Sequence, residues 1–188
     1  MLKGDKVLLR QKRVSDADND YTWRCDPDLT VLDAAPPLRL SRREYVAFST
    51  DEMRYPHTYR RRFAIDSADG EHIGNCMYYD IDDTSQQAEI GVMIGNREYW
   101  DRGYGTDAVR TLVRHIFGTT RIDRVYLKTL EWNLRAQRCF GKCGFVKCGR
   151  ASKNGHDFII MELHRRWFES QEAGESAGSQ ATIPDQSA

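Results

Sequence analysis

Long apolar runs are missing from this chain of 188 residues, and no stretch approaches the roughly 18 apolar residues of a membrane-spanning helix. The opening Met1–Lys6 lacks the apolar segment of a secretory signal, so we expect a cytoplasmic protein without a membrane anchor. An excess of one charge is also missing, because 28 basic side chains balance 28 acidic ones. This balance gives no electrostatic reason to expect general nucleic-acid binding.

Cysteines with the spacing of metal ligands are absent as well. The five cysteines are an odd number in a chain expected in the cytoplasm, which indicates reduced thiols. Cys139, Cys143 and Cys148 lie close together, but no pair has the two-residue gap of a zinc knuckle, and no histidine cluster follows them. We therefore expect no metal site, and we expect Cys139 to pack in the core.

The chain does contain enough apolar sequence for a folded domain. Hydrophobic residues make up 40% of it and charged residues 30%, and its length suits about one domain. From about Glu169 to Ala188, large apolar residues nearly disappear. We expect one domain over residues 1–168 and a disordered tail over residues 169–188.

The order of apolar runs and helix signals predicts an α/β fold. Ser15 and Ser41 stand where helix N-caps belong, after a first strand at Val7–Arg10. Three closely spaced strand-like runs then suggest an antiparallel meander, and helices and strands alternate after them. We expect a mixed, largely antiparallel sheet of about six to seven strands flanked by about four helices. The later elements are predicted at residues 62–66, 72–81, 88–94, 104–117, 124–130, 134–142, from 145 onward, and at 157–163.

The segment Trp100–Val109 is the most informative one. It follows a strand, holds Gly103 and Gly105 two residues apart, and leads into an amphipathic helix. Glycines let a ligand approach backbone N–H groups, and the start of a helix favours a phosphate, to which Arg102 and Thr106 would add a charge and a hydroxyl. A turn that merely starts a helix fits the spacing equally well. A P-loop and a dinucleotide fingerprint do not fit, because the lysine of the first and the opening strand–helix–strand unit of the second are missing.

Four motifs follow one another along the chain: Glu89–Gly95, Tyr99–Ala108, Asn133–Ala136 and Phe140–Phe145. Together they resemble the GNAT superfamily of acyl-CoA-dependent N-acetyltransferases, and most of all the branch that includes the bacterial ribosomal-protein N-terminal-alanine acetyltransferases. The resemblance covers roughly residues 6–164. It implies a central sheet that is splayed in its middle.

The resemblance also implies that the glycine loop holds the diphosphate of acetyl-CoA and that a splayed strand pairs with the pantetheine arm. One departure from the family pattern is Trp100, which stands where glutamine or arginine is common. The residues that the resemblance assigns to the cofactor are Met93, Ile94, Arg102, Gly103, Tyr104, Gly105, Thr106, Asn133 and Phe140.

Acetyl transfer to an amine requires a neutral nucleophile. At pH 7 a lysine with a pKa of ~10.4 must be shifted by about three units, whereas an α-amine at ~7.7–8 needs only about one, so the α-amine is the easier acceptor. Glu89 is the candidate base, with a structural strand glutamate as the equal alternative. The general acid is open, because Phe140 stands where many members have tyrosine. Tyr78, Tyr79, Tyr104 and solvent are the alternatives.

We expect the chain to move an acetyl group from acetyl-CoA to a primary amine by direct attack in a ternary complex. The acceptor is a small molecule or a protein N-terminus. Trp23 and Tyr99 are expected to line its site, because the first two helices cover the acceptor in this family. The alternative is a CoA-binding sensor or interaction module of the same fold without turnover, supported only by Phe140. A homodimer is left open as well.

Overall fold

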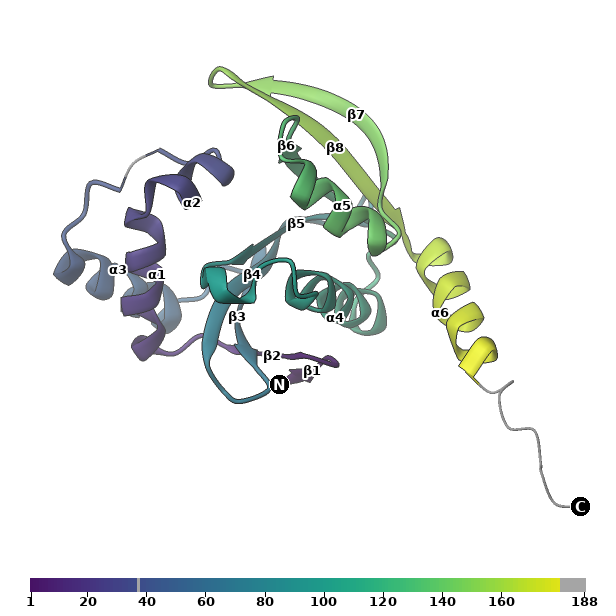
Figure 1. Cartoon of the computed structure of the whole chain (residues 1–188), viewed down its shortest axis with the longest axis horizontal. Helices are drawn as coiled ribbons and strands as arrows, with labels where there is room; N and C mark the ends of the chain where they lie inside the picture. The colour runs from purple at the N-terminus through teal and green to yellow at the C-terminus, as the bar shows by residue number, and fades with distance from the viewer. Residues whose placement is uncertain (37, 180–188) are drawn as a thin grey trace, which may run out of the picture.

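One eight-stranded sheet runs through the chain (Figure 1). The computed structural model describes residues 1–36 and 38–179. Neighbouring strands follow the order β1-β2-β3-β4-β5-β6-β8-β7, and every neighbouring pair is antiparallel except β5 and β6, which run parallel. The strands are β1 (Leu2–Lys3), β2 (Val7–Gln11), β3 (Arg60–Ser67), β4 (His72–Asp82), β5 (Gln87–Ile94), β6 (Arg124–Leu130), β7 (Val146–Lys153) and β8 (His156–His164).

Helices cover both faces of this sheet. Side chains alternate along β5, so Ile90 joins the apolar core beneath α4, whereas Glu89 and Met93 face the opposite side, where α1 packs. Figure 1 shows α1, α2 and α3 grouped together at one end of the sheet. The helices are α1 (Ala17–Cys25), α2 (Pro27–Leu32), α3 (Arg42–Arg54), α4 (Tyr104–Thr119), α5 (Leu134–Lys142) and α6 (Arg165–Ser179), with short 3₁₀ turns η1 (Val14–Asp16) and η2 (Arg97–Tyr99).

The expected fold class is confirmed, and the numbers of strands and of helices differ from those expected. The described chain has eight strands rather than six or seven, because the two-residue β1 adds to the sheet edge. It has six α-helices rather than four, because α2 and α6 were not expected. None of the helices within these described residues is long and apolar enough to cross a bilayer.

The two unexpected helices have different causes, a cap within the chain for α2 and a tertiary contact for α6. Asp26 ends α1 and also caps α2, accepting hydrogen bonds from the N–H groups of Asp28 and Leu29, with Pro27 at the first helical position. The disordered tail was expected to start at Glu169, but α6 continues to Ser179. Phe168 anchors this helix by packing its ring 5.7 Å from that of Phe117. Residues 180–188 of the expected tail lie outside the described residues.

The expected capping signal at Ser41 is confirmed at the start of α3. The Ser41 hydroxyl accepts from the N–H of Glu44, and the Glu44 carboxylate accepts from the Ser41 N–H at 2.8 Å. This reciprocal pair satisfies two N–H groups that the first turn of a helix leaves unpaired. It fixes the start of a helix that otherwise buries little.

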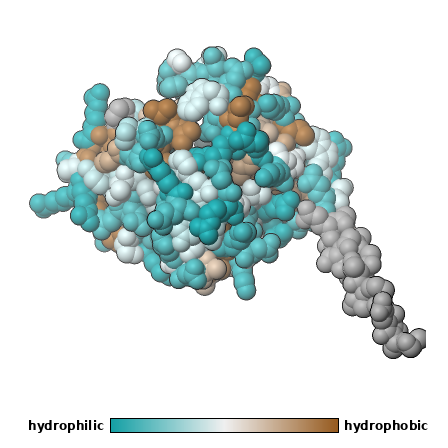
Figure 2. Space-filling model, in the orientation of Figure 1, coloured by the Kyte–Doolittle hydropathy of each residue, from teal (hydrophilic) through white to brown (hydrophobic). Residues whose placement is uncertain are grey.

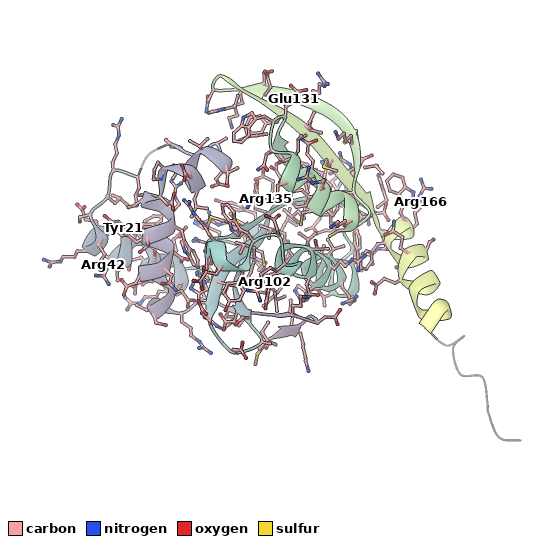
Figure 3. The ribbon with its side chains drawn as sticks, viewed as in Figure 1. Tyr21, Arg42, Arg102, Glu131, Arg135 and Arg166 are labelled. Carbon is pink, nitrogen blue, oxygen red and sulfur yellow. The ribbon has the colours of Figure 1, made fainter. Side chains whose placement is uncertain are left out.

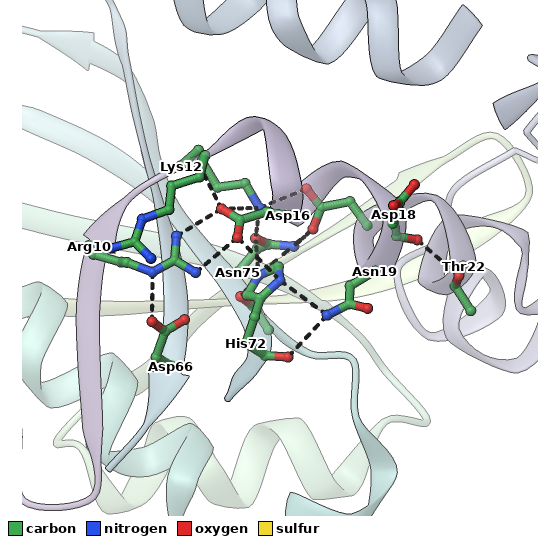
Figure 4. A network of polar contacts seen from close by, with 12 residues as sticks. Arg10, Lys12, Asp16, Asp18, Asn19, Thr22, Asp66, His72 and Asn75 are labelled. Carbon is green, nitrogen blue, oxygen red and sulfur yellow. Dashed lines mark hydrogen bonds and ion pairs between the residues drawn. The ribbon is translucent and has the colours of Figure 1, made fainter. Parts of the chain in front are cut away.

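A buried charge network joins the start of α1 to the sheet (Figure 4). Arg10 on β2 donates to Asp16 with two nitrogens at 2.8 Å each and to Asp66 on β3 at 2.6 Å. Lys12 lies 2.6 Å from Asp20 on α1. Burial alone would raise the pKa of Asp16, but the hydrogen bonds from Arg10 and from the backbone lower it below its usual value. The network therefore holds Asp16 ionised.

We expect Asp16→Asn to reduce the free energy of unfolding by about 3 kcal/mol at pH 7, because it leaves the buried Arg10 charge partly uncompensated. Since the folded pKa of Asp16 is lowered, this contribution is present above the unfolded pKa of ~3.9 and disappears as the pH falls below it. Urea unfolding at pH 7 and at lower pH measures the difference.

The matched control is Asp18→Asn. Asp18 pairs with Arg42 at 2.8 Å, but both side chains are more than half exposed. We expect its loss to cost less than about 1 kcal/mol. Equal effects of the two substitutions would contradict a stabilising role for the buried network.

Candidate functional site

The most unusual feature of the sheet is the short pairing between β5 and β6. Within the described chain, only Gln87–Glu89 on β5 pair with Arg124–Tyr126 on β6. Beyond these three residue pairs β5 stays paired with β4 and β6 with β8. The two strands therefore part, and the β6-facing edge of β5 from Ile90 onward carries backbone groups without ladder partners among the described strands.

A cavity of about 210 Å³ lies beside this parting. Its wall comes from the end of β5, the loop that follows it, the first turns of α4 and one side of α5. The lining residues are Val92, Ile94, Tyr99, Trp100, Asp101, Gly103, Gly105, Thr106, Val109, Arg135, Ala136, Arg138, Cys139, Phe140 and Lys142.

Gly103 shapes the part of the cavity at the start of α4. It is the N-cap of this helix and has a φ of +87°, a left-handed conformation that costs a glycine little. The first N–H groups of α4 have no partner within the helix and carry a partial positive charge. At Gly105 an added Cβ would lie 3.5 Å from the Cys139 sulfur, so α4 and α5 approach closely here.

Three cations of α5 line the same cavity. Arg135, Arg138 and Lys142 recur at intervals of three and four residues, which places them on one side of the helix. The Arg135 guanidinium lies 3.5 Å from the centre of the Trp100 ring, and the Trp100 indole N–H donates to the carbonyl of Ile94 at 2.7 Å. Figure 3 shows Arg135 near the start of α5 and Arg102 near the start of α4. The arrangement suits an extended polyanion.

The structure brings six of the predicted site residues to this cavity. The glycine loop and α5 supply most of them, and the end of β5 supplies one. They are Ile94, Gly103, Gly105, Thr106 and Phe140, together with Tyr99, which was predicted for the acceptor rather than for the cofactor.

Other predicted residues lie near the cavity but outside the described lining. The carbonyl of Met93 faces β4, since an added Cβ at Gly74 would lie 2.2 Å from it. Asn133 caps α5, its side-chain oxygen accepting from the Ala136 N–H at 3.1 Å. Arg102 lies 5.9 Å from the centre of the Tyr104 ring, beside the N-terminus of α4.

The two residues predicted for the acceptor have other contacts in the structure. Trp23 is 8% exposed and packs on the end of β5, where an added Cβ at Gly95 would lie 2.1 Å from its ring. Tyr99 donates from its hydroxyl to Glu71 at 2.8 Å and meets the Tyr104 ring edge-on. Trp23 is therefore buried against the end of β5, and Tyr99 lines the cavity.

Glu89 lies in the last residue pair before the strands part. It is 5% exposed, and one of its carboxylate oxygens accepts from the Tyr79 hydroxyl at 2.8 Å, while the other lies 2.5 Å from the Lys128 nitrogen. Burial and the Glu89 charge raise the pKa of Tyr79, so this phenol stays protonated and donates. For Lys128, burial acts to lower the pKa, but the hydrogen bond to Glu89 raises it overall.

The remaining candidates for a general acid lie in different places. Tyr78 is 6% exposed and stacks against Phe63, and as the residue before Tyr79 on β4 it faces the opposite side of the sheet from Glu89. Phe140 is 8% exposed and packs against Phe145. Of the tyrosines considered from the sequence, Tyr79 is the one that contacts Glu89.

Cys139 does not pack in the core as expected, because its thiol lines the cavity. Its sulfur lies 3.5 Å from the Thr106 hydroxyl. A hydrogen bond from the Cys143 thiol lowers the pKa of Cys139 to about 7 against the opposing effect of burial, with Lys142 and Arg135 adding positive charge. All five cysteines lie in the described part of the chain, and none is disulfide-bonded.

Two parts of the site were missed from the sequence. The cations of α5 could have been found from their spacing, since 135, 138 and 142 fall on one side of any helix. The contact between Lys128 and Glu89 had no such signal, because the parallel register that brings them together joins residues far apart in the chain. No group of three or more metal-ligating side chains occurs among the residues described.

A model of the acetyltransferase (GNAT) domain matches residues 6–146 of the chain. The chain belongs to the GNAT family. An uncharacterized N-acetyltransferase of Bacillus licheniformis is 25% identical over 77% of this chain and 82% of its own length. The spermine/spermidine N(1)-acetyltransferase of Bacillus subtilis is 26% identical over 50% of this chain and 66% of its own. An aminoglycoside N(6′)-acetyltransferase of Klebsiella pneumoniae is 30% identical over 43% of this chain and 40% of its own.

Solved structures of GNAT proteins share the fold. The spermidine N-acetyltransferase from Vibrio cholerae, in complex with CoA and spermine, superimposes with a TM-score of 0.76 at 18% identity, covering 87% of this chain and 98% of that one. An aminoglycoside acetyltransferase in complex with coenzyme A gives 0.75 at 21% identity, covering 88% and 99%.

These relatives define the enzyme class but not the expected branch. They are named N-acetyltransferases, and this GNAT chain is one as well. By their names they act on spermine, spermidine or aminoglycosides, so the closest resemblance expected from the sequence, to ribosomal-protein N-terminal acetyltransferases, is not the one that the comparisons support.

We expect Cys139 to react with iodoacetamide at pH 7 about tenfold faster than Cys148, because about half of a thiol with a pKa near 7 is ionised there. Cys148 is the matched control. Its side chain is exposed, and partial desolvation together with the Glu162 charge raises its pKa. Peptide-resolved mass spectrometry at several pH values measures both rates. Faster labelling of Cys148 would contradict an activated thiol in the cavity.

Proposed function

We propose that this chain transfers the acetyl group of acetyl-CoA to a primary amine by direct attack in a ternary complex. The observation that carries the proposal is the parting of β5 from β6 beside a cavity that holds a glycine turn, a helix N-terminus and three cations. Acetyl-CoA combines a chain of amide groups with phosphate charge. The open edge of β5 suits the amide chain, and the cavity with its glycine turn and cations suits the phosphates.

The phosphate end is supported by the residues at the starts of α4 and α5. Free N–H groups after Gly103 favour an anion at the helix N-terminus. Arg135, Arg138 and Lys142 add positive charge along the cavity. Trp100 supports one of these cations by stacking, and it replaces the glutamine or arginine that the family often has at this position.

The thioester end is supported by the open edge of β5. Backbone N–H groups near Met93 and Ile94 are the candidates to polarise the thioester carbonyl, because an oxyanion that develops there needs donors fixed in advance. Acetyl-CoA supplies the activated acyl group. Glu89 lies at the point where the strands part, and it is proposed to take the acceptor's proton, directly or through a water.

The leaving thiolate does not depend on a tyrosine in this proposal. Coenzyme A's thiol has a pKa near that of cysteine, ~8.5, so water can supply its proton. Phe140 packs in the wall of the cavity and cannot donate a proton. Its contribution is to shape the apolar surface beside the cofactor.

A small-molecule amine is the acceptor we favour, since the named relatives act on such amines. Figure 2 shows a mostly hydrophilic face whose hydrophobic side chains gather in its upper half, where α2 and the start of α5 lie. Val31 on α2 is 54% exposed, and Trp132 and Leu134 beside α5 are 55% and 57% exposed. An acceptor entering between these elements meets an apolar rim.

We expect Gly103→Glu to weaken coenzyme A binding at least tenfold, which corresponds to about 1.4 kcal/mol, because it adds a negative charge and a side chain at the proposed phosphate site. Gly70→Glu is the matched control. Gly70 has a φ of +84° and no neighbour within 4 Å of an added Cβ. Both substitutions strain a left-handed residue, but only the first should change binding, as calorimetry would show. Unchanged binding in Gly103→Glu would refute the site.

The reaction itself is tested by release of free thiol from acetyl-CoA in the presence of an amine panel. Spermine, an aminoglycoside and a peptide with an N-terminal alanine represent the three acceptor classes. We expect thiol release with at least one of the small amines. Binding of coenzyme A without release for any amine would favour the sensor alternative.

We expect Glu89→Gln to lower kcat/KM by about a hundredfold and to remove the acidic limb of its pH profile, because the variant lacks a carboxylate that can take a proton. Glu162→Gln is the matched control, since Glu162 forms a similar ion pair with Arg124 at 2.6 Å on the neighbouring strands. An intact pH profile in Glu89→Gln would remove Glu89 from the proposed chemistry.

A further inference from the structure

The Lys128 side chain crosses the point where the sheet divides. Lys128 lies on β6, two residues beyond Tyr126, the last β6 residue to pair with β5. Its nitrogen nevertheless reaches back to β5 and lies 2.5 Å from a carboxylate oxygen of Glu89. A primary amine of the protein itself therefore lies at the mouth of the gap between the strands.

This amine is open on the side from which an acceptor would approach. Tyr126 and Lys128 alternate with Val125 and Leu127, which are buried in the core under α4. The Lys128 nitrogen lies 5.4 Å from the centre of the Tyr126 ring. The side chain of Lys128 is 41% exposed, whereas that of Glu89 is 7% exposed. Its nitrogen lies where the proposed mechanism needs the nitrogen of an acceptor.

We propose that Lys128 is a self-acetylation site, at which the chain transfers an acetyl group from its own bound acetyl-CoA to the Lys128 nitrogen. The inference rests on the proposed function, because it requires the thioester to enter the gap between β5 and β6. It adds a protein acceptor to that function. The supporting geometry is the contact between a primary amine and the carboxylate that is proposed to take the acceptor's proton.

The step balances without a further reactant. The Lys128 ammonium gives one proton to Glu89, and the neutral nitrogen attacks the thioester carbonyl. The carbon–nitrogen bond forms, the carbon–sulfur bond breaks, and the second proton lost by nitrogen protonates the leaving thiolate. Lysine ammonium and acetyl-CoA become acetyl-lysine, coenzyme A and one proton, which leaves Glu89 for solvent.

The titratable groups around Lys128 make this step slow at neutral pH. Glu89 on β5, Tyr126 on β6, and Tyr79 and Asp80 on β4 surround it, and Glu89 raises its pKa although burial alone would lower it. Less than about one molecule in 10³ then has a neutral Lys128 at pH 7. The rate of modification should rise about tenfold per pH unit between pH 7 and 9.

Modification would also change the state of Glu89. Acetyl-lysine carries no charge, so the ion pair that now engages one Glu89 oxygen would be lost. The other oxygen would keep its hydrogen bond from Tyr79. An acceptor ammonium could then occupy the place that Lys128 holds in the unmodified chain.

The experiment incubates the full chain with acetyl-CoA and no added amine, and follows acetylation of each lysine by peptide-resolved mass spectrometry. We expect acetylation at Lys128 with a rate per molecule that does not change on dilution, because donor and acceptor share one chain. Excess free coenzyme A should slow it at least tenfold. Lys147, an exposed lysine on β7, is the matched reference within the same chain.

Three outcomes would overturn the proposal. Lys128 could stay unmodified while acetyl-CoA binds and small amines are acetylated, which would leave the proposed function intact. Lys128 could be modified no faster than Lys147, or at a rate that excess coenzyme A does not slow, and either result would indicate direct chemical acetylation. Absence of acetyl-CoA binding, measured separately by calorimetry, would instead count against the proposed function.

Discussion

The short parallel ladder between β5 and β6 is the constraint on which the rest of the site depends. Three residue pairs hold the two strands together, and the edge of β5 beyond them is left without a neighbouring strand. Unpaired backbone groups inside a protein are costly unless they find another partner. The Trp100 indole supplies such a partner to the Ile94 carbonyl, and the cavity lies beside this edge.

Charge is distributed around this gap in a consistent way. The N-terminus of α4 and the cations of α5 lie on the cavity side, whereas Glu89, Tyr79 and Lys128 lie on the side of the sheet that α1 covers. The first set suits a polyanion and the second suits proton transfer to and from an amine. The sheet separates the two, so a substrate that passes through the gap meets both.

Much of this architecture could be predicted from the sequence. The helix Leu134–Lys142 was predicted with its observed bounds, and the glycine loop was placed correctly before α4, because capping residues and amphipathic spacing are local signals. β1 is too short to show alternation, and α6 depends on the packing of Phe168 against Phe117, which is a tertiary contact. Local patterns cannot show such contacts.

The residues of the site also fall into two groups, those that local sequence could predict and those that tertiary contacts bring together. Gly103, Gly105 and Thr106 lie close together in the sequence at the start of α4, so their proximity follows from the chain itself. The ion pair between Glu89 and Lys128 and the stacking of Arg135 on Trp100 depend on the parallel register of β5 and β6 and on the position of α5. The sequence indicated Glu89 as a candidate, but its contacts with Tyr79 and Lys128 could be seen only in the assembled sheet.

The short pairing of β5 with β6 also affects how rigidly the two parts of the sheet are held together. The strands β1–β5, with α1 packed against them, form one side of the sheet, and β6–β8 form the other, joined at this junction by three rungs. An extended amide-bearing molecule lodged in the gap would add rungs of its own and so brace the two sides against each other. Such a molecule would be a structural element as well as a reactant. This favours an ordered binding sequence in which acetyl-CoA binds first and the amine then enters a more rigid cleft.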